Sequence, residues 1–138
     1  MHDEVEIIRR VCEGFDRGDI DVLLSSLHPD VEWNEAEHVT FWPGSAFTGP
    51  NAIVQWAVRP DPRDLRTTWK VQVERLYNCG TTVIMQGRYR GTVQSTGRDL
   101  ASQVVHIWDL EGNKIVRFQQ YTDTWLFAEA TGVAPETT

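Results

Sequence analysis

Hydrophobic and polar positions alternate with two different periods along this chain, helical near its start and β further on. Four apolar residues are spaced for one face of a first helix: Val5, Ile8, Cys12 and Phe15. This spacing predicts a helix over residues 3–18 that ends at Gly18. A second helix is expected to begin at Asp19 or Asp21 and to end at His28-Pro29, because the residue before a proline avoids the helical region.

Alternation of period two predicts strands on both sides of a third helix. The first strand is expected over residues 31–37, with Val31, Trp33 and Glu35 on one face. An irregular loop over residues 38–48 precedes a helix that starts at Gly49-Pro50-Asn51. The other expected elements are strands over 68–77, 81–92, 100–110 and 114–124, a helical turn or two over 125–131, and a disordered tail over 132–138.

These elements predict one α+β domain over residues 1–138, with helices packed on one face of a curved, mostly antiparallel sheet. In the hairpin of the last two strands, one set of side chains faces the helices: Ser102, Val104, His106, Trp108, Phe118, Gln120 and Thr122. The opposite face carries Val105, Ile107, Gln119 and Tyr121. This mixture of polar and apolar groups suits a homodimer interface.

The composition and net charge indicate which kinds of molecule this protein is not expected to bind. The chain has 138 residues and a formal net charge of −7, whereas phosphate recognition needs clustered Lys and Arg. We therefore expect neither nucleic acid nor an anionic membrane as a partner. No apolar run approaches 18 residues, and the acidic start lacks the basic region of a signal peptide, so a soluble cytoplasmic protein is expected.

Motifs for metals and cofactors are missing from the sequence. The four histidines are scattered, and Cys12 and Cys79 lack CxxC spacing, so we expect neither a metal site nor a disulfide, and Cys12 is interpreted as a small core residue. The sequence also contains no glycine-rich phosphate loop or nucleophile elbow. A reaction, if there is one, is expected to need no cofactor.

Four segments carry a resemblance to a known family: Glu13–Asp19, Leu27–Trp33, Phe47–Pro50 and Gly112–Asp123. With the order of the elements, they resemble the SnoaL-like proteins, the polyketide-cyclase and ketosteroid-isomerase relatives within the nuclear transport factor 2-like superfamily. The resemblance covers almost the whole chain. It implies a cone of helices around a bent sheet with a pocket inside, and it leaves the reaction open because this fold hosts many activities.

The resemblance also shows where the family's catalytic groups would fall. His106 matches the pocket histidine of SnoaL-like cyclases, but their acid/base aspartate aligns with Gln120, whose amide cannot exchange a proton at neutral pH. The base of ketosteroid isomerases aligns with Trp33. The Arg and two Asp of limonene-epoxide-hydrolase-like members align with Gly87, Tyr89 and Gln120, which excludes that chemistry.

Three residues remain as candidate catalytic groups. Glu35 is expected either inside the apolar pocket, with a raised pKa that suits proton transfer, or on a solvated rim. His106 would polarise a ligand carbonyl or serve as a core histidine, and Tyr89 would bind an oxyanion or form pocket wall. Asp123 is expected to have a structural role near the end of the last strand.

The expected pocket lining is rich in aromatic rings and consists of Trp33, Trp42, Phe47, Met85, Trp108, Phe118 and Gln120. Such a pocket fits a small hydrophobic carbonyl compound. Three functions are open at this point: an isomerase, cyclase or lyase that transfers a proton without a cofactor, a binding module without turnover, and a protein-interaction domain whose pocket is filled by side chains.

Overall fold

The computed structural model describes residues 4–39, 46–58, 70–93 and 96–132. Its helices are α1 (Glu4–Arg17), α2 (Ile20–Ser26), α3 (Pro50–Val58) and α4 (Thr124–Thr131). Its strands are β1 (Leu27–Asn34), β2 (Phe47–Thr48), β3 (Lys70–Cys79), β4 (Thr82–Thr92), β5 (Asp99–Glu111) and β6 (Lys114–Thr122). The α+β class expected from the sequence is confirmed.

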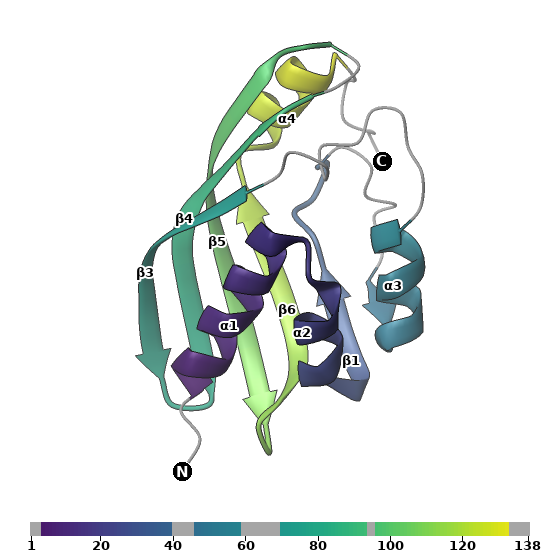
Figure 1. Cartoon of the computed structure of the whole chain (residues 1–138), viewed down its shortest axis with the longest axis vertical. Coiled ribbons are helices and arrows are strands. Elements are labelled where there is room, and N and C mark those ends of the chain that lie inside the picture. The colour runs from purple at the N-terminus through teal and green to yellow at the C-terminus, as the bar shows by residue number, and fades with distance from the viewer. Residues whose placement is uncertain (1–3, 40–45, 59–69, 94–95, 133–138) are drawn as a thin grey trace.

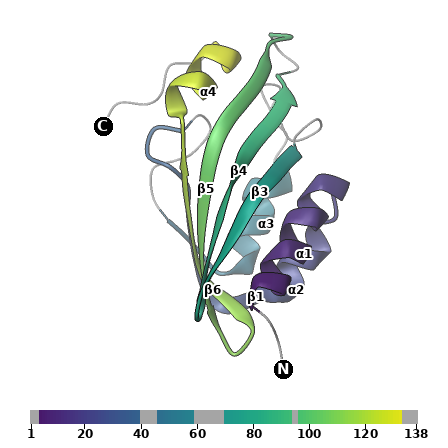
Figure 2. The same ribbon diagram turned by 90° about the vertical axis from the view of Figure 1, so that its left-hand side faces the viewer.

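The strands form one sheet in the order β2-β1-β6-β5-β4-β3 (Figure 1). All neighbours are antiparallel except β1 and β6, which run parallel. Helices α1, α2 and α3 lie on one side of the sheet (Figure 2), and α4 lies at the end opposite the β5–β6 turn (Figure 1). The long hairpin of β5 and β6 therefore occupies the middle of a sheet that bends around the helices.

Alternation along β5 decides which side chains enter the core. Val104, His106 and Trp108 are buried, whereas Val105 and Ile107 are half-buried on the other face. Helix α1 covers the buried face with Ile8 and Val11, which are 0% and 1% exposed. Other members of the same core are Cys12, Val31, Ile53, Val83, Met85, Ile115 and Phe118. Cys12 is thus a core residue as expected, and its thiol is free.

The second helix ends earlier than the sequence predicted. Asp19 caps its start by accepting a hydrogen bond from the Asp21 N–H at 3.1 Å, but the helix stops at Ser26 and β1 begins at Leu27. The residue before Pro29 avoids the helical region, so the chain is already extended where Leu27 pairs with Ile115 of β6. His28 and Pro29 belong to a strand rather than to a helix end.

The expected irregular loop also contains a short strand. Phe47 and Thr48 form β2, which pairs antiparallel with β1 so that Phe47 lies opposite Trp33. Two residues are too few for period-two alternation to be recognised in a sequence. At the other end of the chain, Gly132 caps α4 with a positive φ of 70°, and residues 133–138 lie outside the described part.

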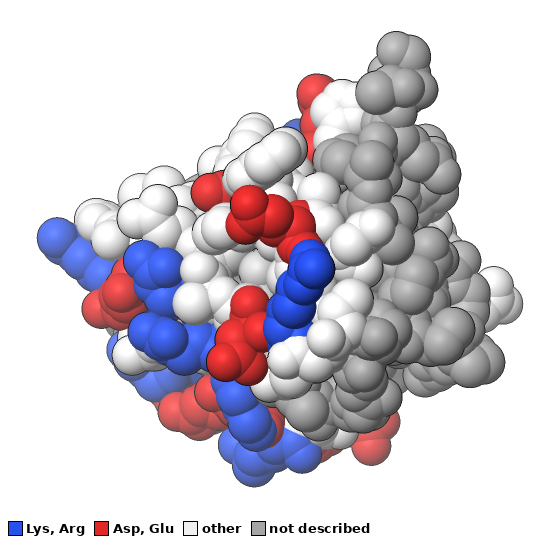
Figure 3. Space-filling model, turned by 90° about the horizontal axis from the view of Figure 1, so that it is seen from above, with Lys and Arg blue, Asp and Glu red and all other residues white. Residues whose placement is uncertain are grey.

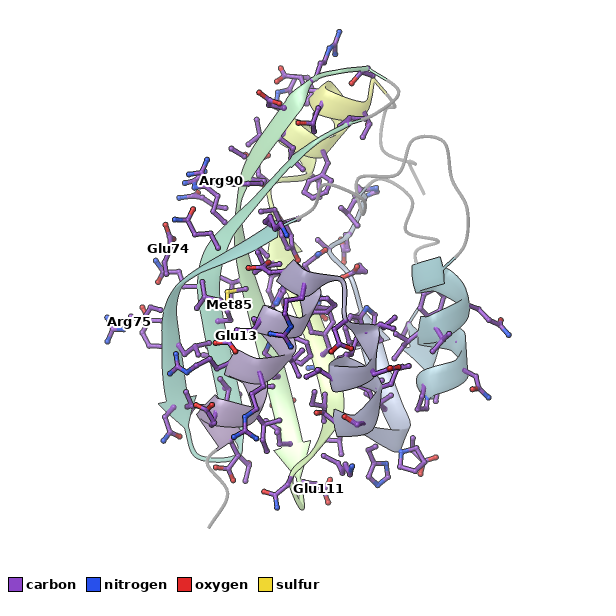
Figure 4. All side chains as sticks on the ribbon, viewed as in Figure 1. Glu13, Glu74, Arg75, Met85, Arg90 and Glu111 are labelled. Carbon is purple, nitrogen blue, oxygen red and sulfur yellow. The ribbon has the colours of Figure 1, made fainter. Side chains whose placement is uncertain are left out.

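A β-bulge in β3 lies opposite Gly87. The register shifts between Val73, which pairs with Gly87, and Arg75, which pairs with Gln86. Glu74 and Arg75 project from the β3 side of the sheet, and Met85 of β4 lies beside α1 in this view (Figure 4). A Cβ at position 87 would come within 2.4 Å of the Gln72 carbonyl oxygen, so the absence of a side chain lets the two strands approach here.

Replacing Gly87 by Ala should destabilise the protein by about 1–3 kcal/mol, because the added methyl group meets a backbone oxygen that cannot move aside freely. Urea unfolding followed by tryptophan fluorescence measures this change. Gln86→Ala, an exposed position on the same strand, is the control and should stay within about 0.5 kcal/mol of wild type. Equal stabilities for the two variants would contradict the close approach at Gly87.

Candidate functional site

Aromatic rings from three strands form a compact cluster on the helix-covered face of the sheet. Phe118 of β6 stacks on Trp33 of β1 with ring centroids 3.9 Å apart. Trp108 of β5 lies 4.5 Å from Phe118 and 5.8 Å from Trp33. His106, two residues before Trp108 on the same face, lies 4.8 Å from Phe118. Since β1 runs parallel to β6, the first strand delivers its indole to the rings of the final hairpin.

A chain of hydrogen bonds runs across the same face, from the end of β1 to β5. The Ala36 N–H donates to Oε1 of Gln120 at 3.1 Å, and Nε2 of Gln120 donates to the Tyr89 hydroxyl at 2.8 Å. That hydroxyl lies 2.5 Å from Nε2 of His106. All three side chains are at least 96% buried. These hydrogen bonds therefore connect three of the predicted site residues, Gln120, Tyr89 and His106, in a region shielded from water.

Burial changes the pKa of each titratable group in this region. It lowers the pKa of His106 from 6.5 to about 3, so the imidazole is neutral at physiological pH. It also raises the pKa of Tyr89 well above its ordinary value, and the charge of Glu35 adds to that increase. Glu35 directly precedes Ala36, whose N–H begins this series of hydrogen bonds, so residue 35 joins the site at that point.

Glu35 follows the last residue of β1 and brings its carboxyl group to this region. Part of the residue remains exposed, but its Oε2 is buried and has no hydrogen-bond partner among the described residues. Because no partner compensates the loss of water, desolvation raises the pKa of Glu35 from 4.5 to about 8. The pKa of Glu35 therefore lies closer to neutrality than that of an ordinary carboxyl group.

Four buried polar atoms in this part of the protein lack a partner within the described ranges: Trp33 Nε1, Glu35 Oε2, His106 Nδ1 and Trp108 Nε1. Most buried polar groups in folded proteins are hydrogen-bonded. Here the exceptions come from two strand regions, and all four belong to predicted site residues. This concentration marks the helix-covered face around Phe118 as the candidate site.

The structure gathers most of the predicted site residues. Met85 is fully buried and lies opposite His106 in the β4–β5 pairing, and Phe47 is half-buried beside Trp33. Trp42 lies outside the described residues. Asp123 caps the start of α4 by accepting a hydrogen bond from the Leu126 N–H at 3.2 Å, which is the structural role expected for it.

Two contributors to the site were missed by sequence reasoning. The backbone N–H of Ala36 carries no signal in a sequence because every residue except proline has one. Phe127 of α4 meets the Tyr89 ring edge-on at 6.1 Å between centroids, and its apolar character within the short last helix was the available signal. Helix α4 thereby covers Tyr89.

An open hollow of about 400 Å³ lies apart from this cluster, between α4 and the start of β5. It is lined by Arg98, Asp99, Leu100, Ala101, Leu126, Glu129 and Ala130, none of which is a predicted site residue. Arg98 donates there to the Glu129 carbonyl at 2.6 Å. Seen from the α4 end, acidic and basic residues are interspersed among uncharged ones (Figure 3).

Two further observations concern the described ranges alone. No group of three His, Cys, Asp or Glu residues there is arranged to hold a metal ion. No helix there combines the length and the apolar composition needed to cross a bilayer.

The Glu35→Gln substitution should change how stability depends on pH. Because the pKa of Glu35 is raised by folding, the folded protein holds a proton between pH 4.5 and about 8 that the unfolded chain releases. The wild type should therefore lose stability relative to the variant by up to about 1.4 kcal/mol per pH unit across this range. Denaturant unfolding of both proteins at pH 5, 6, 7 and 8 measures the difference, and the exposed Glu37→Gln is the control. A pH-independent difference would show that Glu35 titrates normally.

Comparisons with known proteins agree with this architecture. An NTF2-like protein from Burkholderia thailandensis superposes with a TM-score of 0.82 at 30% identity, covering 94% of this chain and 98% of that one. One of unknown function from Burkholderia pseudomallei has a TM-score of 0.85 at 23% identity, with 95% and 98% coverage. TerC, crystallised with polyporic acid, has a TM-score of 0.82 at 25% identity, with 94% and 98% coverage.

No curated protein matches the sequence. The family model of the SnoaL-like domain matches residues 8–118, which form the greater part of the chain. The match extends from α1 to the phenylalanine at the centre of the ring cluster. This protein therefore belongs to the SnoaL-like family, within the NTF2-like superfamily.

Proposed function

We propose that this protein binds a small hydrophobic carbonyl compound against the ring cluster and moves a proton on it without a cofactor, as an isomerase, cyclase or lyase. The observation that carries the proposal is the buried Oε2 of Glu35, which has no hydrogen-bond partner among the described residues and belongs to the neighbour of Ala36, where the hydrogen bonds to Gln120, Tyr89 and His106 begin. The structural relative TerC, which was crystallised with polyporic acid, supports a small organic ligand.

Glu35 is the group assigned to exchange the proton. A general base works best when its pKa lies near the operating pH, and a pKa of about 8 meets that condition. The pKa of His106, about 3, is too low for the imidazole to carry a proton at neutral pH, which leaves that histidine for hydrogen bonding. The aromatic rings would hold the apolar body of the ligand, and the chain from Gln120 to His106 would orient its oxygen.

The alternative is a binding module without turnover. It is favoured by one observation: Gln120 replaces the acid that SnoaL-like cyclases are expected to have at this place, and its amide is hydrogen-bonded to Ala36 and Tyr89. Binding and proton transfer must therefore be measured separately.

Proton transfer can be measured without knowing the natural substrate. Binding of 1-tetralone is first followed through the fluorescence of Trp33 and Trp108, and exchange of its α-protons for deuterium in heavy water is then followed by NMR. The wild type should exchange at least about a hundredfold faster than Glu35→Gln, the low end of general base catalysis. The rate should rise with pH and level off above about 8 as Glu35 ionises.

The control is Glu37→Gln, two residues further on and exposed, which should exchange at the wild-type rate. Equal exchange by wild type and Glu35→Gln, with the ketone bound to both, would remove Glu35 as the base. Binding without exchange in the wild type would establish the binding-module alternative.

We further propose that the face opposite the helices forms a homodimer. Tyr121 is 55% exposed there, and Val105 and Ile107 are only half-buried in the single chain. Contact with a second copy would remove this apolar surface from water.

Replacing Ile107 by Glu should convert the dimer to a monomer, because an acidic side chain would be buried without a partner in the interface. Light scattering coupled to gel filtration measures the mass. Gln55→Glu adds the same charge at an exposed position on α3 and should leave the dimer intact. A monomeric wild type would contradict this proposal.

A further inference from the structure

The hydrogen-bonded chain between Ala36 and His106 has a direction. A backbone N–H can only donate, so the Gln120 amide must present its oxygen to Ala36, and its NH₂ group then faces Tyr89. The Tyr89 oxygen therefore accepts a hydrogen bond from Gln120. The direction of each hydrogen bond is thus determined by the previous one, and the first donor, the Ala36 N–H, cannot act as an acceptor.

The last step fixes the tautomer of His106. The Tyr89 oxygen lies 2.5 Å from Nε2, which is shorter than the usual range for an N–H donor and lies at the short end for a hydroxyl donor. The hydroxyl therefore donates and Nε2 accepts. A neutral imidazole carries one proton, so that proton resides on Nδ1.

His106 Nδ1 is thus a buried N–H donor, and it has no acceptor among the described residues. The indole N–H groups of Trp33 and Trp108 are also buried without an acceptor among the described residues. Both indoles and the His106 imidazole pack on Phe118. Three donors without acceptors around one phenylalanine call for a ligand that supplies accepting oxygen.

We propose that Gln120 and Tyr89 are positioning residues that fix His106 as a hydrogen-bond donor through Nδ1, so that the site selects ligands with an accepting oxygen, a ketone or its enolate. This inference rests on the proposed function for the position of the ligand, but the tautomer it assigns does not depend on any ligand. In this arrangement His106 is the donor to the ligand oxygen, and Glu35 remains the group that exchanges the proton.

The tautomer is tested by ¹⁵N NMR of the whole protein labelled at histidine. The protonated ring nitrogen is recognised by its chemical shift and by its coupling to the attached proton, and the His106 signals are assigned by their loss in His106→Asn. The expected result is a proton on Nδ1. His28 provides an internal reference for the opposite tautomer, because its Nδ1 accepts from the Asp30 N–H at 3.0 Å. A proton on Nε2 of His106 would overturn the proposal.

The positioning role is tested with Tyr89→Phe, which removes only the hydroxyl. His106 should then populate both tautomers, a readout that a purely structural role of Tyr89 would not move. Tyr77→Phe is the matched control, since it removes a hydroxyl that bonds Gln86 at an exposed position, and it should keep the wild-type tautomer. An unchanged His106 spectrum in folded Tyr89→Phe would contradict the role of the chain.

Selection of an accepting oxygen is tested with two ligands of the same bicyclic shape, 1-tetralone and tetralin, which differ in the carbonyl oxygen. Wild type and Tyr77→Phe should bind the ketone at least about tenfold more tightly, the factor that corresponds to one hydrogen bond. That preference should shrink in Tyr89→Phe and in His106→Leu.

The failures of the two proposals are distinguishable. Equal affinities of the wild type for the two compounds would overturn the ligand selection even if deuterium exchange depended on Glu35. If neither compound bound, the ligand part of both proposals would fall, while the NMR spectrum would still decide the tautomer. Normal selection without exchange would remove only the catalytic proposal.

Discussion

The hydrogen bond from the Ala36 backbone to Gln120 joins the two halves of the site. It connects residues 84 positions apart, at the place where the first strand runs parallel to the last one. A main-chain donor cannot rotate or titrate, so it gives the amide one orientation and passes that orientation to Tyr89 and His106. The chemistry of the imidazole therefore depends on the register of β1 against β6.

Burial on the helix-covered face works in two directions. Removal of the Trp33, Trp108 and Phe118 rings from water lowers the free energy of the folded protein and so stabilises the sheet and its helices. The same exclusion of water leaves polar atoms of Glu35, Trp33 and Trp108 without hydrogen-bond partners in the described part of the protein, at a cost in stability. The folded protein tolerates this cost because the aromatic contacts around it are extensive, and sites that act on ligands commonly retain such local conflicts.

Much of the fold could be predicted from the sequence because alternation is a local property. It assigned His106, Trp108, Phe118 and Gln120 to one face of the final hairpin, and the structure has them there. Features that depend on distant pairing could not be read in this way. Leu27 is extended because it meets Ile115, and Phe47 is in a strand because it meets Trp33.

In the candidate site too, the residue types could be read from the sequence, but their surroundings could not. The residue types at positions 35, 89 and 106 pointed to proton transfer and hydrogen bonding, but the sequence could not say whether Glu35 lies in water or out of it. That outcome depends on what surrounds the carboxyl group in three dimensions, and here its Oε2 is buried. Nor could the sequence reveal that Gln120 is held by a main-chain amide from β1. The role of an amide side chain becomes readable only when its partners are known.

The NH₂ group of Gln120 determines the direction of the hydrogen bonds in the site. An ionised carboxylate at position 120 would still accept from Ala36, but it would also accept from Tyr89, where the amide now donates. The Tyr89 oxygen would then receive its hydrogen bond from His106, and Nδ1 would carry a lone pair instead of a proton. Replacing the NH₂ of Gln120 by an oxygen would thus change Nδ1 of His106 from a hydrogen-bond donor to the ligand into an acceptor.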